Sequence, residues 1–336
     1  MSRLRGSSRV LPHDREITSL PVRLGGLGLL SHEEVAPHAR AAMSESADHI
    51  LWKALTFADA SLEDKAAAPP LPASFRAQSV RCQAAFAERR EALLGSLSIR
   101  ERVGLIDRSS PIARKWLSTI PYHPHLRLSD VEVSAGLHDR TLCPGQEDHC
   151  SCGGRNVFGH DEVCPTREHF RVSRHEKIKE LFCRHIKSIS RTSAVVEPFL
   201  PGSQRRADIR VTGPGAHRGA VADYDLTVVN SSQVDSLIPS SGAHPSGSLP
   251  AFPIASTGLS ALHRHLTSAE SRKRAQYRGQ IPTVHPLVIS TSGTLSPASE
   301  KIVDHWRKLM TGSSYSHLTS SISLSLVRSH TKSFAL

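Results

Sequence analysis

The stretch RRADIRVTGPGAHRGAVADYDLTVV, residues 205–229, decides the fold class. Apolar and polar residues alternate in RRADIRV and again in AVADYDLTVV, which predicts two β-strands. The glycines and the proline between them predict a turn, so the two strands can pair. The alternation places Asp208 on the face opposite Ile209 and Asp225 on the face opposite Tyr224. Pairing across the turn would bring the two carboxylates side by side.

Two neighbouring carboxylates repel each other unless a cation neutralises them. A hard cation such as Mg²⁺ or Mn²⁺ takes oxygen ligands, activates a water and stabilises charge on a scissile phosphate. Asp208 and Asp225 are therefore candidate metal ligands and candidate catalytic residues. The alternative is two exposed strand aspartates near a turn, and the spacing alone does not choose between them.

Four other polar residues are candidates for the same site. Lys273 and Tyr277 lie four residues apart on a predicted helix and so share a face. A lysine beside a scissile phosphate can stabilise its charge, although Lys273 also belongs to a basic run, RKR, that a solvated helix face would explain. His175 lies on the apolar side of an earlier predicted helix and should point toward the sheet. Glu197 is either a third acid or a strand terminus.

The elements around this stretch predict an α/β fold. Residues 46–141 are predicted to be helical, with Ser129 or Asp130 capping the last helix. From residue 172 onward the predicted order is α-β-β-β-α-β-α, a small mixed sheet with helices against it. The stretch 231–258 is rich in Ser, Pro and Gly, which predicts a loop or disordered insert. The last residues are Ser-rich, and we expect a weakly ordered tail.

A cysteine-rich segment precedes the predicted sheet. Cys150, Cys152, His160 and Cys164 have the spacing C-x-C-x7-H-x3-C. Thiolate sulfur and neutral imidazole nitrogen are ligands that Zn²⁺ takes in a tetrahedron. Four protein ligands leave no open position, so a zinc ion here would be structural. The alternative is a set of ordinary buried thiols.

The composition is basic, with 42 Lys and Arg against 31 Asp and Glu and a net charge of +11. A basic chain commonly binds a polyanion, most often nucleic acid, unless the charge serves solubility alone. No apolar run reaches the length of about 18 residues that a membrane span needs. The N-terminus lacks the apolar core of a signal peptide. We therefore expect an intracellular protein whose cysteines are free or bind metal.

Several motifs together resemble the C-terminal part of non-LTR retrotransposon polyproteins of the class that carries a restriction-like endonuclease. The similarity covers roughly residues 18–310, and the motifs follow in the family's order. They are LPVRLGGLGL (residues 20–29), CSCGGRNVFGHDEVC (150–164), Arg174–His175, RRADIRV with YDLTVV, Lys273-x3-Tyr277 and HPLVIST (285–291).

The resemblance implies a division of the chain into units. These are a remnant of the reverse-transcriptase thumb (1–45), a helical linker region (46–141), a CCHC-type zinc knuckle (142–166), an endonuclease domain of the PD-(D/E)XK type (167–312, with a flexible insert at 231–257) and a Ser-rich tail (313–336). The polymerase palm, with adjacent aspartates in a tight hairpin, has no counterpart in the sequence. We therefore expect no DNA synthesis by this chain alone.

The resemblance also implies roles for individual residues. Asp208 and Asp225 would be the first and second metal-binding acids. Thr227 stands where the family type usually has a lysine, and Lys273 would take its place, with Tyr277 beside it. Ala207 stands where a proline is usual. These departures leave a decayed, inactive copy as an alternative.

The function expected from all of this is metal-dependent nicking of target DNA in a nuclear protein. Arg174, His175, Arg205 and Arg206 would seat the nucleic-acid backbone, Zn²⁺ would be structural, and Mg²⁺ or Mn²⁺ would be catalytic. DNA is the expected partner, with the RNA of such an element as a second candidate and no membrane. An inactive nucleic-acid-binding remnant is the main alternative. A protein-interaction module is another, and the sequence does not predict the oligomeric state.

Overall fold

The computed structural model describes residues 11–58, 77–144, 149–202, 204–233, 254–279 and 284–334. A four-stranded mixed sheet in the order β1-β2-β3-β4 lies at its centre. β1 pairs antiparallel with β2, β2 pairs antiparallel with β3, and β3 runs parallel to β4. The strands span Ser193–Val196 (β1), Ile209–Thr212 (β2), Val221–Val229 (β3) and Val284–Ser290 (β4).

Three helices complete the predicted α-β-β-β-α-β-α order. They are α8 (Glu168–Ile186), α9 (Ile254–Gln276) and α10 (Pro297–Leu309). Parallel strands need a crossover connection, and α9 makes it between β3 and β4. The α/β class and the mixed sheet flanked by helices are therefore confirmed.

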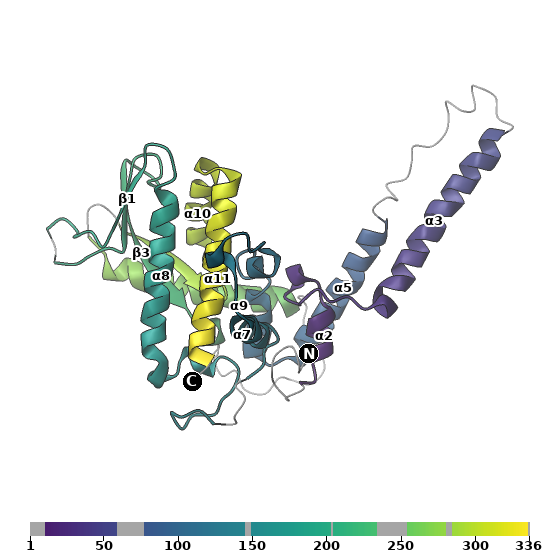
Figure 1. Ribbon diagram of the computed structural model, residues 1–336, viewed down its shortest axis with the longest axis horizontal. Coiled ribbons are helices and arrows are strands. Elements are labelled where there is room, and N and C mark those ends of the chain that lie inside the picture. The colour runs from purple at the N-terminus through teal and green to yellow at the C-terminus, as the bar shows by residue number, and fades with distance from the viewer. Residues whose placement is uncertain are drawn as a thin grey trace.

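The two faces of the sheet carry different helices (Figure 1). On β4, Leu287 and Ile289 belong to one apolar cluster and Val288 to the other, as alternation requires. The first cluster takes its helical side chains from α8, α10 and a C-terminal helix, with Trp306 fully buried. The second takes them from α9 and from helices of the N-terminal half. The sheet is thus covered on both faces.

The N-terminal half is helical, as predicted. Ser98 and Ser129 each cap a helix by a capping box, in which a Glu three residues later returns a hydrogen bond. In Figure 1, α3 and α5 form a hairpin that projects away from the sheet. The elements are α2 (Asp14–Ser19), η1 (Val22–Leu24), α3 (His32–Ala58), α5 (Ala77–Ser96), α6 (Ile99–Asp107), η3 (Lys115–Ser118), η4 (Pro124–Leu126) and α7 (Asp130–Arg140), with η5 (His160–Glu162) and η6 (Pro165–Arg167) before α8.

The expectation of a weakly ordered Ser-rich tail is wrong. Residues Gly312–Phe334 form one long helix, α11, which packs along α8 and α7. Leu318, Ile322 and Leu326 lie at helical spacing and enter the same cluster as α8. The serines between them are buried as well. Small hydroxyl side chains let neighbouring helices approach closely, so here the serines belong to a packed interface.

Most of the predicted flexible insert, residues 234–253, lies outside the described residues. α9 begins at Ile254, inside the end of the stretch 231–258 that was predicted to be a loop or disordered insert. None of the helices in the described ranges has the length and apolarity needed to cross a bilayer.

Candidate nuclease site and Cys/His cluster

Asp225 lies on β3 and faces the end of α9. Lys273 Nζ is 2.7 Å from Asp225 Oδ2. The Tyr277 hydroxyl donates to Asp225 Oδ1 at 3.1 Å. Residues four apart on a helix share a face, which lets both side chains reach the same carboxylate. The structure therefore brings together Asp225, Lys273 and Tyr277.

Asp208 lies just before β2, where the regular ladder ends. Its N–H donates to the Tyr224 carbonyl, and its Oδ2 accepts the Leu226 N–H at 2.6 Å. His175 of α8 places Nε2 3.2 Å from the same oxygen and 3.1 Å from the Leu226 carbonyl. Asp208 is thus held against β3 at Leu226, the residue after Asp225. The predicted inward orientation of His175 is confirmed.

The electrostatics of the two acids differ. Burial raises the pKa of Asp225, the charge of Asp208 adds to the rise, and Lys273 offsets it only in part. Burial acts the same way on Asp208, but the hydrogen bond and charge of His175 dominate and lower its pKa. The hydrogen bond to Asp208 in turn raises the pKa of His175. Asp225 is therefore the acid whose negative charge is less well compensated.

Two oxygens on one face of β3 lack hydrogen bonds. Thr227 Oγ1 is buried without a partner. Asp225 Oδ2 is close to the Lys273 ammonium but makes no hydrogen bond of good geometry. Residues 225 and 227 share a strand face, so both oxygens point to the same side of the sheet. Thr227 brings no positive charge to this site.

The predicted backbone-binding arginines have different positions. Arg205 donates to the Gln276 carbonyl at 2.6 Å, and Arg206 stacks on Phe199 with its guanidinium 4.3 Å from the ring centroid. Both are exposed; Arg205 lies beside the end of α9, and Arg206 also pairs with Glu197 at 3.4 Å.

Arg174 does not fit the predicted role in seating a nucleic-acid backbone. Only 6% of it is exposed, and it forms an ion pair with Glu162 at 2.7 Å. It faces η5 and the cysteine-rich segment rather than solvent. Its charge is already neutralised by a buried partner, so it is a structural residue.

Sequence reasoning missed Lys179, which lies on α8 four residues after His175. Its Nζ is 2.6 Å from Glu176 Oε2 and 2.6 Å from Glu197 Oε1, and the side chain is almost fully buried. Its charge also acts on Asp208. Glu197 adopts a φ of +52°, a strained value for a residue other than glycine. The spacing from His175 was the available signal, because it places Lys179 on the inward side of α8.

The Cys/His cluster is present in the structure. Ligand atoms of Cys150, Cys152, His160 and Cys164 all lie within 4.8 Å of one another, an arrangement that can bind a metal such as zinc. Cys164 N–H donates to the His160 carbonyl at 3.0 Å, so a single turn separates these two ligands. A hydrogen bond from the Cys152 main chain lowers the pKa of the Cys150 thiol to about 6, which favours the thiolate that a metal needs.

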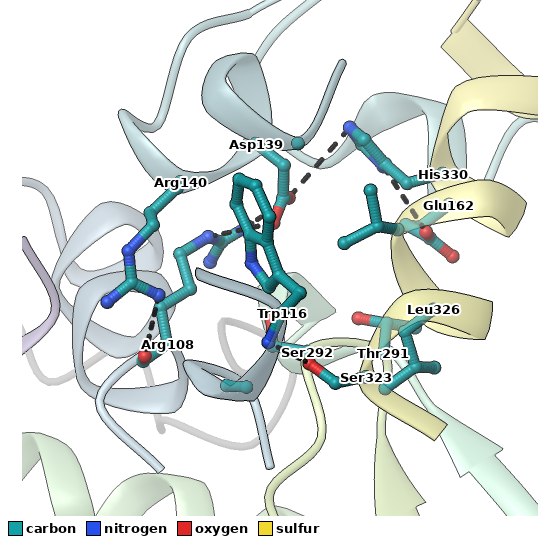
Figure 2. A pocket seen from close by; sticks show the side chains of 13 residues that line it. Arg108, Trp116, Asp139, Arg140, Glu162, Thr291, Ser292, Ser323, Leu326 and His330 are labelled. Carbon is teal, nitrogen blue, oxygen red and sulfur yellow. Dashed lines mark hydrogen bonds and ion pairs between the residues drawn. The ribbon is translucent and has the colours of Figure 1, made fainter. Parts of the chain in front are cut away.

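The cluster is anchored to the rest of the molecule by buried charges (Figure 2). Glu162, two residues after His160, pairs with Arg174 and lies 3.8 Å from His330 of α11. Burial would raise the pKa of Glu162, but Arg174 and His330 hold it at about 2. On its other side His330 is 3.9 Å from Asp139, which accepts from Arg108. These ion pairs join η5 to α6, α7, α8 and α11.

No known protein-family model matches the chain, and no curated protein matches it.

Proposed function

We propose that this chain is the nuclease-bearing part of a non-LTR retrotransposon protein and that it nicks DNA by metal-dependent hydrolysis in a PD-(D/E)XK-like fold. The observation that carries the proposal is the convergence of Asp208, Asp225 and Lys273 at one end of the sheet. Two neighbouring acids, one on β3 and one just before β2, with a lysine beside them are the groups that phosphodiester hydrolysis needs.

The residues fit a hard cation. Asp225 has a buried oxygen whose partner is the Lys273 ammonium, a raised pKa and a second carboxylate nearby. Thr227 adds a buried oxygen without a hydrogen bond on the same face. Oxygen ligands of this kind suit Mg²⁺ or Mn²⁺. Asp208 and Asp225 would hold the ion, which would supply an activated water and neutralise charge on the phosphate.

The side chains around the acids have distinct parts in this proposal. The Leu226 N–H and His175 hold Asp208 in a fixed orientation. Tyr277 orients Asp225 through its hydroxyl. Lys273 neutralises Asp225 Oδ2 in the structure. Once a metal ion neutralises that oxygen, the Lys273 ammonium would be able to stabilise charge on the scissile phosphate. Arg205 and Arg206 are exposed and suit contact with the DNA backbone.

The Cys/His cluster would hold a structural zinc ion, because four protein ligands close the coordination sphere. Purified protein should then contain about one zinc per chain. Cys152→Ser should lose that zinc, whereas Cys82→Ser, outside the cluster, should retain it. Equal zinc content in the two variants would contradict this assignment.

The test of the nuclease is plasmid nicking by Asp225→Asn with Mg²⁺ present. Asparagine keeps the shape but removes the charge, and we expect nicking to fall by about 100-fold or more. Asp304→Asn on the exposed face of α10 is the matched control and should retain the parental rate. Circular dichroism and DNA binding of both variants would establish that they fold. Parental nicking by Asp225→Asn would refute the proposal.

A second candidate is an inactive nucleic-acid-binding remnant of such an element. The observation in its favour is that Thr227 stands where the family type carries a lysine, while Lys273 is engaged with Asp225. This candidate predicts salt-sensitive DNA binding without any nicking that depends on Mg²⁺ or Mn²⁺. The same assay therefore separates the two.

A further inference from the structure

A basic groove lies away from the carboxylate site, between η1, the segment 111–118 and the first turns of α11. Its volume is about 650 Å³. Arg23, Arg114 and Lys115 line it, and none of its lining residues is an Asp or Glu. The rest of its polar lining consists of hydroxyl groups, from Ser118, Tyr315, Ser316 and Thr319. We call it the Arg114 groove.

The positive charge of the Arg114 groove is uncompensated. Within the described part of the chain, Arg23, Arg114 and Lys115 make no ion pair. The buried Arg140 lies behind them, and its pKa is lowered to about 9 by burial and by the charges of Arg108 and Arg114, while Asp139 offsets this only in part. The charge of Arg114 therefore acts unfavourably on Arg140, and an anion in the groove would relieve that repulsion.

The walls of the groove are held in place by hydrogen bonds. Arg140 donates to the carbonyls of Val22 and Gly26 at 2.8 and 2.9 Å and to that of Arg108 at 3.0 Å. Figure 2 shows Arg140 and Arg108 side by side, with Trp116 next to them. The Trp116 N–H donates to Ser323 of α11 at 3.0 Å, which ties η3 to α11. A groove whose walls are already fixed binds a ligand at a lower entropic cost.

We propose that the Arg114 groove binds the phosphate backbone of DNA. Arg, Lys and hydroxyl side chains are the usual partners of phosphate oxygens, and the groove gathers three cations and four hydroxyl groups without an acidic residue. The net charge of +11 fits a polyanion of any size. The inference rests on the proposed function only in taking DNA as that polyanion, and it adds a binding surface outside the nuclease site.

The test measures binding of a duplex oligonucleotide at several salt concentrations, without divalent cation and in the Asp225→Asn background. Binding is then read independently of cleavage. The groove variant carries Arg23→Gln, Arg114→Gln and Lys115→Gln. The matched control carries Lys187→Gln, Arg191→Gln and Lys301→Gln, three exposed cations outside the groove. Both lose the same charge, and circular dichroism would establish that both fold.

The groove variant should reduce the slope of log K against log salt by about 2 to 3, because each phosphate contact contributes about 0.9. The control variant should change the slope by less than about 0.9, the contribution of one phosphate contact. Arg114→Lys alone should keep the parental slope. Equal losses in the groove variant and the control would overturn the proposal, as would a chain that binds no DNA. Loss of binding to vesicles of anionic lipid with DNA binding intact would assign the groove to membrane headgroups instead.

Discussion

Lys273 supplies the positive charge beside the two acids, where Thr227 supplies none. Lys273→Met removes the charge and keeps the length of the side chain. We expect nicking to fall by about 100-fold, since loss of one group that stabilises transition-state charge has that effect, and DNA binding to change little. Arg274→Met is the control, because Arg274 is adjacent and exposed. Equal nicking rates for the two variants would show that Lys273 serves only the stability of Asp225.

A row of three neighbouring histidines makes the stability of the fold depend on pH. His185 Nε2 is 3.2 Å from His317 Nδ1, and His317 Nε2 is 3.0 Å from His125. Burial, followed by the charges of His317 and Arg184, lowers the pKa of His185 to about 4. The unfolded chain, with an ordinary pKa near 6.5, therefore binds more protons between pH 4 and 6.5, and stability falls as the pH falls through this window.

At pH 5 His185 should cost about 2 kcal/mol of stability relative to pH 7.5. Urea unfolding at the two pH values would measure this cost. Glutamine does not titrate, so His185→Gln should lose that part of the pH dependence. His263 does not belong to this row of histidines, so His263→Gln should retain it. An unchanged pH dependence in His185→Gln would show that His185 is protonated without penalty in the fold.

At the scale of elements, the Cys/His segment is attached to α8 through the ion pair of Arg174 with Glu162. Both side chains are less than a tenth exposed. Glu162→Gln leaves a buried guanidinium without its counter-charge and should lower the free energy of unfolding by about 3 kcal/mol. Glu168→Gln changes an exposed pair with Arg171 and should cost less than about 1 kcal/mol. Urea unfolding measures both, and equal effects would show that Arg174 finds another partner.

The strands and helices of the candidate site show what the sequence could and could not predict. Period-two alternation was enough to place Asp225 on the face of β3 that meets Lys273 and Tyr277, and helical spacing was enough to pair those two residues. Asp208 lies just before β2, so strand alternation did not fix the direction of its side chain. The partner of Arg174 lies in an irregular segment, where no periodicity fixes the direction of a side chain. α11 was missed because serine is only a moderate helix former, and its burial depends on α8, more than a hundred residues earlier.

At the scale of the whole molecule, one apolar cluster joins the predicted thumb remnant, helical region, knuckle and nuclease units. Leu20 just after α2, Leu105 of α6, Phe158 and Val288 of β4 all belong to it. A buried bond adds to this contact, because Ser290 donates to Asp107 at 2.6 Å. The boundaries predicted from the resemblance are crossed by this packing, so we expect the units to unfold together.

Leu20→Ala tests that expectation from the N-terminal end. Leu20 is 1% exposed, and its truncation should cost about 2–5 kcal/mol. If the cluster unfolds as one unit, hydrogen exchange should accelerate at amides of α9 and β4 as well as in α2, since slow exchange reports the free energy of the shared unfolding unit. Leu29→Ala, at a position 54% exposed, should leave exchange unchanged. Faster exchange confined to α2 would mean that the nuclease half holds its structure without the N-terminal segment.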